Sequence, residues 1–306
     1  MSKGRDYTPL FRGALTLNSR KDPSRLITTE EGLVELAEAV NVDIDDSYRV
    51  SRRGGAEATD IAVPVQTVWG TGDHLFCVIA DTLYAVGSGW ALSALQGGLT
   101  QGVDMAFKAV ESQVYFSNGY QTGIIDLDSM TTKAWQGQAY VGPPTSRSFS
   151  DPPAGHLIEY YAGRMWIGAG NILYFTEPFA LSWVDMAKNL IPFRSRLRVV
   201  REVRSGLVIS SSQALYFFGG SNPDDMQVHK LALYPAIEGT DVALEGEDMP
   251  EEMQGGGVIL TTTQGICVVD EAGSFRNLTR DRIDYPPGSK GCAYLYRGKY
   301  VTSFEI

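Results

Sequence analysis

Short apolar runs separated by small polar turns recur along the chain. In residues 112–126, the run Val114-Tyr115-Phe116 is followed by Ser117-Asn118-Gly119 and then by a second apolar run, Ile124-Ile125. β-Branched and aromatic residues favour strands, whereas Ser, Asn and Gly favour tight turns. This pattern predicts a β-hairpin. Four other segments repeat the pattern, at 75–86, 165–175, 207–218 and 258–269.

The spacing of these hairpins indicates a repeat. Their first strands begin near residues 75, 114, 165, 207 and 258, which gives steps of 39, 51, 42 and 51 residues. A repeat of roughly 40–50 residues that consists of strands alone is typical of β-propeller blades. A β-sandwich also has short strands at regular spacing and is the alternative. We favour the propeller because the hairpins resemble one another in detail.

Two further hairpins, one toward each end of the chain, have no neighbouring hairpin. They cover 39–55, where apolar and polar residues alternate, and 291–306. If the two paired, they would form a composite blade and hide the sheet edges that an open array exposes. We therefore predict an all-β fold, a single β-propeller of about six blades over 39–306, with the ring closed by pairing of the N- and C-terminal strands. Residues 1–38 are expected to form an extended N-terminal arm and closing segment.

Charge and cysteine content narrow the functional classes. A net charge of −10 and a pI near 4.9 argue against a surface that binds nucleic acids by neutralising their phosphates. Cys77 and Cys267 lie inside apolar strand patterns and Cys292 stands apart, so we expect free thiols and synthesis in a reducing cytosol. The first thirty residues lack the apolar segment of a signal peptide, and no run approaches the ~18 apolar residues of a membrane-spanning helix. We expect a soluble protein without a membrane anchor.

Residues that could carry chemistry do not gather in the sequence. His74, His156 and His229 each lack a second His or Cys at ligand spacing. We therefore expect no enzymatic activity, no cofactor and no metal. Catalytic carboxylates contributed by different blades, as in propeller glycosidases, stay open. Stacking of sugars on tryptophan also stays open, although Trp in a strand is more often part of the core. The five tryptophans are Trp69, Trp90, Trp135, Trp166 and Trp183.

An arginine-rich run interrupts this acidic chain at 194–204. It is either a solvated strand face or a docking surface for an acidic partner. The N-terminal arm is also rich in basic residues. We take arginines of both segments as candidate subunit-interface residues. They are Arg12, Arg20, Arg25, Arg194, Arg196, Arg198 and Arg201.

Two segments together resemble a known group of proteins. The stretch Asn41-Val42-Asp43-Ile44-Asp45-Asp46, running to Arg52-Arg53-Gly54-Gly55, resembles the "NVDIDDxGRxxRRxG" opening of certain tailed-bacteriophage virion proteins. The stretch Asp104-Met105-Ala106, followed by residues 114–123, is similar to a second block of the same proteins. Tyr48 stands where those proteins usually have Gly, a departure that concerns a turn. None of the matching motifs is catalytic.

The resemblance implies a structural component of a bacteriophage tail, similar to the propeller domains of tail nozzles and tail hubs. Such a component would form part of a symmetric ring around the DNA exit channel, with other copies of itself and neighbouring tail proteins as partners. DNA would pass without specific binding, because an acidic wall repels phosphates. The implied location is the virion tail, after synthesis in the cytoplasm of the host bacterium. The alternative is a carbohydrate-binding propeller that acts as an adhesin at the tail tip.

Overall fold

The computed structural model of the chain describes most of the region predicted to form the propeller. The described residues are 61, 63–137, 147–250, 253, 255–279, 290–296 and 298–304, with the backbone of two short strands at 42–44 and 50–52. Within these residues the fold is all-β, and five four-stranded antiparallel sheets follow one another along the sequence. We call these sheets blades 1 to 5.

Each blade is built from strands that are near neighbours in the sequence. Blade 1 consists of β3 (Thr67–Thr71), β4 (His74–Ile79), β5 (Thr82–Val86) and β6 (Leu92–Gln96). Blade 2 consists of β7 (Ala106–Val110), β8 (Gln113–Ser117), β9 (Thr122–Asp126) and β10 (Thr131–Lys133). Blade 3 consists of β12 (Leu157–Tyr161), β13 (Arg164–Ala169), β14 (Ile172–Phe175) and β16 (Leu190–Pro192).

The last two blades follow the same plan. Blade 4 consists of β17 (Leu197–Val203), β18 (Gly206–Ser211), β19 (Leu215–Gly219) and β20 (Gln227–Ala232). Blade 5 consists of β21 (Val242–Leu244), β22 (Gly257–Thr262), β23 (Gly265–Asp270) and β24 (Phe275–Asn277). Two short 3₁₀ turns, η3 (Ser88–Trp90) and η4 (Gly246–Asp248), lie between strands.

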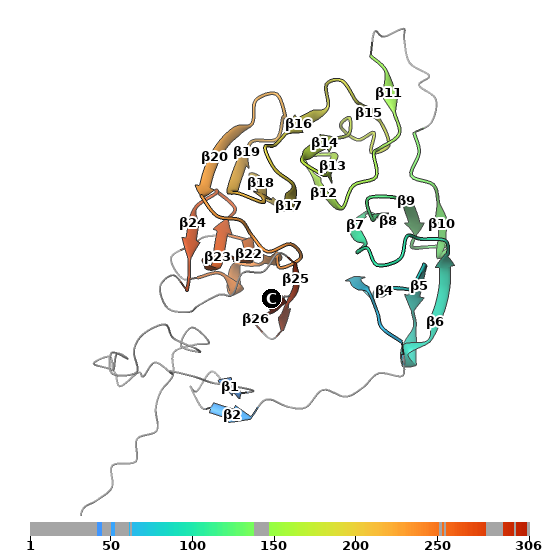
Figure 1. Ribbon diagram of the computed structural model, residues 1–306, viewed down its shortest axis with the longest axis horizontal. Helices are drawn as coiled ribbons and strands as arrows, with labels where there is room; N and C mark the ends of the chain where they lie inside the picture. The colour runs from blue at the N-terminus through green and yellow to red at the C-terminus, as the bar shows by residue number, and fades with distance from the viewer. Residues whose placement is uncertain are drawn as a thin grey trace, which may run out of the picture.

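The blades surround a common centre. Figure 1 shows β7, β12 and β17 on the inside of this arrangement and β6, β10, β20 and β24 on the outside. The first strand of each blade is therefore the innermost one, and the fourth is the outermost. This arrangement of successive four-stranded sheets is a β-propeller, which confirms the predicted fold class.

The five hairpins predicted from the sequence are the middle strands of the five blades: β4–β5, β8–β9, β13–β14, β18–β19 and β22–β23. Middle strands are hydrogen-bonded at both edges and covered on both faces, so they carry the longest apolar runs. β18 and β22 are buried along their whole length. In contrast, the first four residues of the outermost strand β20 are exposed.

The hydrophobic core is divided among the interfaces between neighbouring blades. Blades 1 and 2 meet at Phe76 and Phe116, and blades 3 and 4 meet at Trp166 and Leu207, all of them inaccessible to solvent. Similar clusters join blade 2 to blade 3 and blade 4 to blade 5. Because each blade buries its faces against its neighbours, the blades form one unit and not a set of separate domains.

The C-terminal hairpin continues the propeller beyond blade 5. It consists of β25 (Gly291–Tyr296) and β26 (Lys299–Phe304). Leu295 and Tyr300 pack against the apolar cluster of blade 5, and the Tyr300 hydroxyl donates a hydrogen bond to the carbonyl oxygen of Thr240. The hairpin therefore follows blade 5 as a two-stranded sheet that packs against it.

The predicted pairing of N- and C-terminal strands is not observed. β1 (Val42–Ile44) and β2 (Val50–Arg52) form one two-stranded sheet, and β25 and β26 form another. Across the described part of the chain, no strand of the first sheet pairs with a strand of the second. The C-terminal hairpin packs on blade 5 instead, and Gly291 N donates to the carbonyl oxygen of Glu238, in the connection between blades 4 and 5, at 2.8 Å. The arm predicted for 1–38 lies outside the described residues.

An ion-pair cluster joins an insertion of blade 3 to the segment that contains β11 (Phe149–Ser150). The insertion lies between β14 and β16 and contains β15 (Val184–Asp185), which pairs with β11. Arg147 donates to both a Glu177 oxygen and an Asp185 oxygen at 3.1 Å. The side chains of Glu177 and Asp185 are 18% and 4% exposed. Arg147 therefore pairs with two poorly solvated carboxylates of the insertion and ties it to the segment before β11.

Candidate functional site

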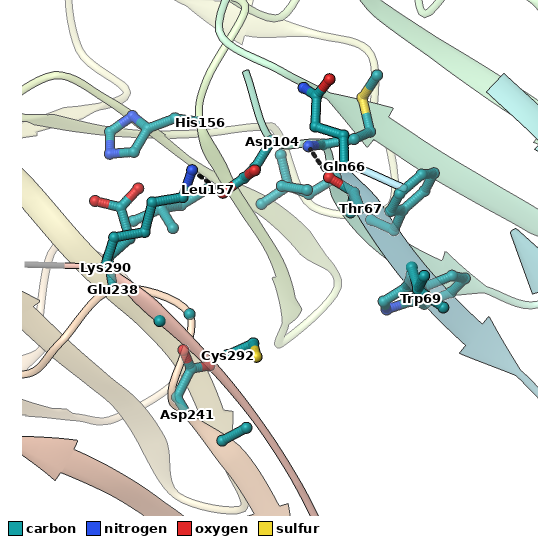
Figure 2. A pocket seen from close by; sticks show the side chains of 18 of the residues that line it. Gln66, Thr67, Trp69, Asp104, His156, Leu157, Glu238, Asp241, Lys290 and Cys292 are labelled. Atoms are coloured by element: carbon teal, nitrogen blue, oxygen red, sulfur yellow. Dashed lines mark hydrogen bonds and ion pairs between the residues drawn. The ribbon is translucent and has the colours of Figure 1, made fainter. Parts of the chain in front are cut away.

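A cavity of about 630 Å³ lies at the centre of the ring of blades (Figure 2). The first strands of blades 1 to 4 contribute Trp69, Phe107, Leu157 and Arg201 to its wall, and the C-terminal hairpin contributes Cys292. Because the first strands are the innermost ones, this cavity lies on the propeller axis. We call it the axial cavity.

A second cavity, of about 560 Å³, adjoins the axial cavity. Both cavities are lined by Asp104, His156, Glu238 and Lys290. The second cavity is otherwise lined by loops of several blades, which contribute Tyr120 and Arg196, and by strand ends such as that of β17, which contributes Arg198. It therefore lies at one end of the axis, where strands of successive blades are connected. We call it the axial mouth.

An ion pair lies at the boundary between the two cavities. Lys290 Nζ is 2.8 Å from Asp104 Oδ2, as Figure 2 shows. Lys290 directly precedes the C-terminal hairpin, whereas Asp104 lies shortly before blade 2. The contact therefore joins the residue before the C-terminal hairpin to the segment before blade 2, at the boundary of the two cavities.

Charged residues occupy the same position on the first strands of blades 2, 3 and 4. Lys108, Glu159 and Arg201 each lie two residues before the last paired residue of their strand. The Glu159 side chain is 1% exposed; one of its oxygens contacts Lys108 Nζ, and the other is 3.5 Å from Arg201 Nη1. Arg201 also pairs with Asp241 at 2.7 Å, and Lys108 pairs with Glu202 at 2.8 Å. We call this set the axial ion-pair network.

The network keeps Arg201 charged. Burial alone would lower the pKa of the guanidinium group, but the carboxylates of Asp241 and Glu159 raise it above its usual value. Buried charges are tolerated when they are paired in this way. Within the described residues, the network offers no unpaired acid or base to a substrate, and its effect is to hold the inner strands of successive blades together.

The hairpin pattern alone misses this network, although the sequence contains a signal for it. Lys108, Glu159 and Arg201 lie at a constant distance from the turn that follows each first strand. Charged residues at one repeated position, in strands that are otherwise largely apolar, indicate a ring of inward charges. Glu159 contacts Lys108 and Arg201 of the two neighbouring blades, each about one repeat away in the sequence, and Lys108 also contacts Glu202, two blades away.

The predicted interface arginines lie in different places. Arg194 and Arg196 are exposed, Arg198 is half-buried in the axial mouth, and Arg201 belongs to the axial ion-pair network. The three arginines of the predicted arm, Arg12, Arg20 and Arg25, lie outside the described residues. The basic run is therefore not one continuous face. A role of these arginines between subunits stays a prediction.

Most of the tryptophans belong to the core. Trp135 and Trp166 are buried, and the Trp166 indole nitrogen donates to the carbonyl oxygen of Tyr161 at 3.2 Å. Trp183 stacks on Phe149 beside the blade 3 insertion, with ring centroids 5.6 Å apart. These three residues present no free ring face on the propeller axis.

The other two tryptophans also fail to form a sugar-stacking surface. Trp90 is 45% exposed but lies in η3, between the two outer strands of blade 1. Trp69 lines the axial cavity, yet its ring stacks on Phe107 at 5.3 Å. The exposed aromatic residue of the axial mouth is Tyr120, which is 67% exposed. The sequence around Tyr120 indicates a turn but does not indicate that the residue lines the axial mouth.

The cysteines are free, as predicted: Cys77 and Cys267 are buried and Cys292 is exposed. Burial raises the thiol pKa of Cys77, and it raises that of Cys267 to about 11. Neither is therefore a nucleophile near neutral pH. Among the described residues, no three His, Cys, Asp or Glu side chains are placed to hold a metal ion. The same residues contain no helix with the length and apolar character needed to cross a membrane.

Comparison with known proteins reveals likeness in structure alone. No family model and no curated protein matches the sequence. The chain is similar to the WD40 domain of Neurospora crassa Pan2, with a TM-score of 0.48 and 9% identity over 79% of this chain and 71% of that one. It is also similar to the N-terminal domain of Nup159, with a TM-score of 0.47 and 8% identity over 78% and 72%.

A third similar structure is much longer than this chain. It is the extracellular domain of BT4673 from B. thetaiotaomicron, with a TM-score of 0.49 and 10% identity. The match covers 81% of this chain but 32% of that domain. At identities of 8 to 10%, these likenesses concern the fold and say nothing of ligands or partners.

Proposed function

We propose that the chain is a structural component of a bacteriophage tail, one of several copies in a symmetric ring around the DNA exit channel. The observation that carries this proposal is the resemblance of 41–55 and 104–123 to tailed-bacteriophage virion proteins. The second of these segments contributes β7, β8 and the turn after β8 to blade 2. A role in assembly, without catalysis, suits a propeller whose axial ion-pair network consists of charges that are paired with one another.

In this proposal the DNA passes between copies and not through the axis of one propeller. The C-terminal hairpin lines the axial cavity, and the Lys290–Asp104 ion pair lies on its boundary. A cavity of about 630 Å³ has the size of a small-molecule site and cannot admit a duplex. The net charge of −10 would keep passing DNA from adhering to the ring.

Assembly of a ring requires exposed contact residues on each copy. Arg194 is exposed, and the Arg204 side chain is 83% exposed with a long contact of 3.9 Å to Glu271. Phe179 and Leu233 are large apolar residues that are 85% and 80% exposed. Arginine and large apolar side chains are typical of protein interfaces. We infer that surfaces around these residues contact neighbouring copies or other tail proteins.

A phage that lacks this chain is expected to have an incomplete tail and to lose infectivity. A nonsense mutation in its gene, on a host that does not suppress it, would produce such particles for negative-stain imaging and titration. The same mutant on a suppressing host is the control and should regain tail and titre. Intact, infective particles without the chain would overturn the proposal.

A carbohydrate-binding role at the tail tip is the second candidate. The observation that favours it is the axial mouth, which combines the exposed ring of Tyr120 with polar and charged groups. Aromatic rings beside hydrogen-bonding groups are suited to sugars, which have apolar and polar faces. This role is compatible with a place in the virion, and its test is direct binding of sugars to the purified protein.

A further inference from the structure

We propose that the axial mouth binds an anionic saccharide, with Arg198 holding the carboxylate or phosphate group and Tyr120 contacting the sugar ring. The proposal gives the carbohydrate-binding candidate a definite site and ligand class. It does not depend on a ring of copies, because every residue that it uses lies in one chain.

Arg198 is the extra residue of a β-bulge. Where β17 pairs with β18, Leu197 lies opposite Ser211 and Val199 lies opposite Ser210, which leaves Arg198 without a partner residue. A bulge redirects the side chain of the inserted residue, and bulges are common beside binding sites. Arg198 lines the axial mouth, whereas Arg201, further along the same strand, belongs to the axial ion-pair network.

Arg198 retains hydrogen-bond donors for a ligand. Its Nε donates to Ser212 Oγ at 3.3 Å, and its Nη1 donates to Ala236 O at 3.2 Å. Both acceptors are neutral, and a guanidinium group has five N–H donors. No carboxylate of the described residues forms an ion pair with Arg198, whereas Arg201 has two such partners. The remaining N–H groups can donate charge-assisted hydrogen bonds to an oxyanion.

The other charged side chains of the axial mouth compensate one another. Arg196 Nη2 lies 3.3 Å from Glu238 Oε1, and Lys290 Nζ lies 2.8 Å from Asp104 Oδ2. The charge of Arg198 is therefore in excess among the described lining residues. In a protein with a net charge of −10, a locally positive cavity favours an anionic ligand over a cationic one.

His156 adds no charge to the axial mouth near pH 7. Burial lowers the pKa of the imidazole, and the nearby Arg196 lowers it further. The backbone carbonyl of Leu197, 2.9 Å from Nε2, and the carboxylate of Glu238 only partly offset this effect. The neutral ring contributes hydrogen-bonding capacity to the cavity wall.

Tyr120 is presented by a turn that hydrogen bonds hold in place. Asn118 Oδ1 accepts from the backbone N–H groups of Tyr120 at 3.0 Å and Gln121 at 2.7 Å. The Gln121 amide accepts from Asn118 Nδ2 at 2.8 Å and donates to Thr100 Oγ1 at 3.0 Å. A turn whose backbone is fixed before binding loses little entropy when a sugar packs against the side chain that it presents.

The axial mouth has room for a small saccharide. Its volume of about 560 Å³ is within the range of small-molecule sites. An added Cβ at Gly102 or Gly170, both of which line the cavity, would have no atom within 4 Å. The cavity is therefore open at these two positions, where a ligand can approach the backbone.

Calorimetric titration of the purified full-length chain with glucuronate, glucose 6-phosphate, glucose and inorganic phosphate tests the proposal. We expect at least one of the two anionic sugars to bind about tenfold more tightly than glucose, a difference of about 1.4 kcal/mol. Binding of one but not the other identifies the carboxylate or the phosphate as the preferred anion. Absence of binding by both anionic sugars, or equal binding of glucose, would overturn the proposal. Inorganic phosphate that binds as tightly as glucose 6-phosphate would overturn the assignment to a saccharide.

Three variants assign the site to the named residues. Arg198→Gln should weaken binding of the anionic sugar about tenfold or more, because it removes the charge. Tyr120→Ala should weaken binding of the sugar while leaving that of inorganic phosphate unchanged. Arg204→Gln is the matched control, since Arg204 is 83% exposed and does not line the mouth. Unchanged sugar affinity in folded Arg198→Gln, or in Tyr120→Ala, would contradict the proposal. If Arg198→Gln does not fold, the Tyr120→Ala result decides.

Discussion

Replacing Arg201 with methionine is expected to lower the free energy of unfolding by about 3 kcal/mol, as measured by urea denaturation. The loss arises because Arg201 is shared by the buried carboxylate of Glu159 and by Asp241, whose side chain is 12% exposed. Without it, Asp241 loses its cation and Glu159 retains Lys108 alone. A charge that stays buried without a partner is destabilising, and methionine fills part of the volume without supplying one.

The neighbouring Arg204 provides a matched control for Arg201. It lies on the same part of the chain, but its side chain is 83% exposed, so Arg204→Met should change stability by less than about 0.5 kcal/mol. Arg201→Lys should fall between the two, because it keeps the charge but loses the planar group that reaches two carboxylates. Equal stabilities of Arg201→Met and Arg204→Met would show that the axial ion-pair network does not stabilise the propeller.

Replacing Arg147 with methionine should lower the free energy of unfolding by about 2–3 kcal/mol at pH 7. Burial alone would raise the pKa of Glu177 and of Asp185, but hydrogen bonds and charge from Arg147 bring both below their usual values. A lowered carboxyl pKa in the folded state stabilises at neutral pH. That contribution is lost as pH falls below about 4 toward the folded-state values.

The pH dependence of the Arg147 effect separates an ion-pair role from a packing role. In Arg147→Met, burial raises the pKa values of the two carboxyl groups because Arg147 no longer opposes it. Protonation at lower pH then removes the buried unpaired charges that destabilise the variant. The difference in unfolding free energy between the wild type and Arg147→Met should therefore shrink from pH 7 to about pH 3.5. A difference that is the same at both pH values would mean that the arginine acts through packing alone.

The sequence predicts the middle strands of the blades well because burial on both faces gives them unbroken apolar runs. β18 and β22, which are buried throughout, are the clearest examples. First strands are harder to recognise, since Lys108 and Glu159 interrupt them with charges whose partners lie in other blades. The order of the blades around the axis follows from the repeat, which is a property of the sequence.

The local pattern predicts each terminal hairpin but not the segment with which that hairpin pairs. Alternation identifies 39–55 and 291–306 as hairpins, and the structure confirms that β1–β2 and β25–β26 are hairpins. Which hairpin pairs with which depends on contacts between distant segments. The anchoring of Tyr300 on Thr240 is one such contact, and no local pattern contains it.

The axial mouth could not be predicted from the sequence because separate blades contribute its residues. Tyr120 lies in a turn sequence whose composition indicates only the turn itself. Arg198 is one of several arginines in a run, and the run does not reveal that Arg196 pairs with Glu238 whereas Arg198 has no carboxylate partner among the described residues. The β-bulge that leaves Arg198 unpaired is a feature of register, which emerges only when β17 and β18 are placed side by side.

An electron cryomicroscopy map of the intact virion is the most direct test of the proposed role in the tail. We predict several identical densities arranged symmetrically around the tail channel, each of which accommodates blades 1 to 5 and the C-terminal hairpin. The DNA path should run between these copies, outside the axial cavity of each. A virion map without such densities, or with DNA passing through the axis of one propeller, would contradict the role that we propose.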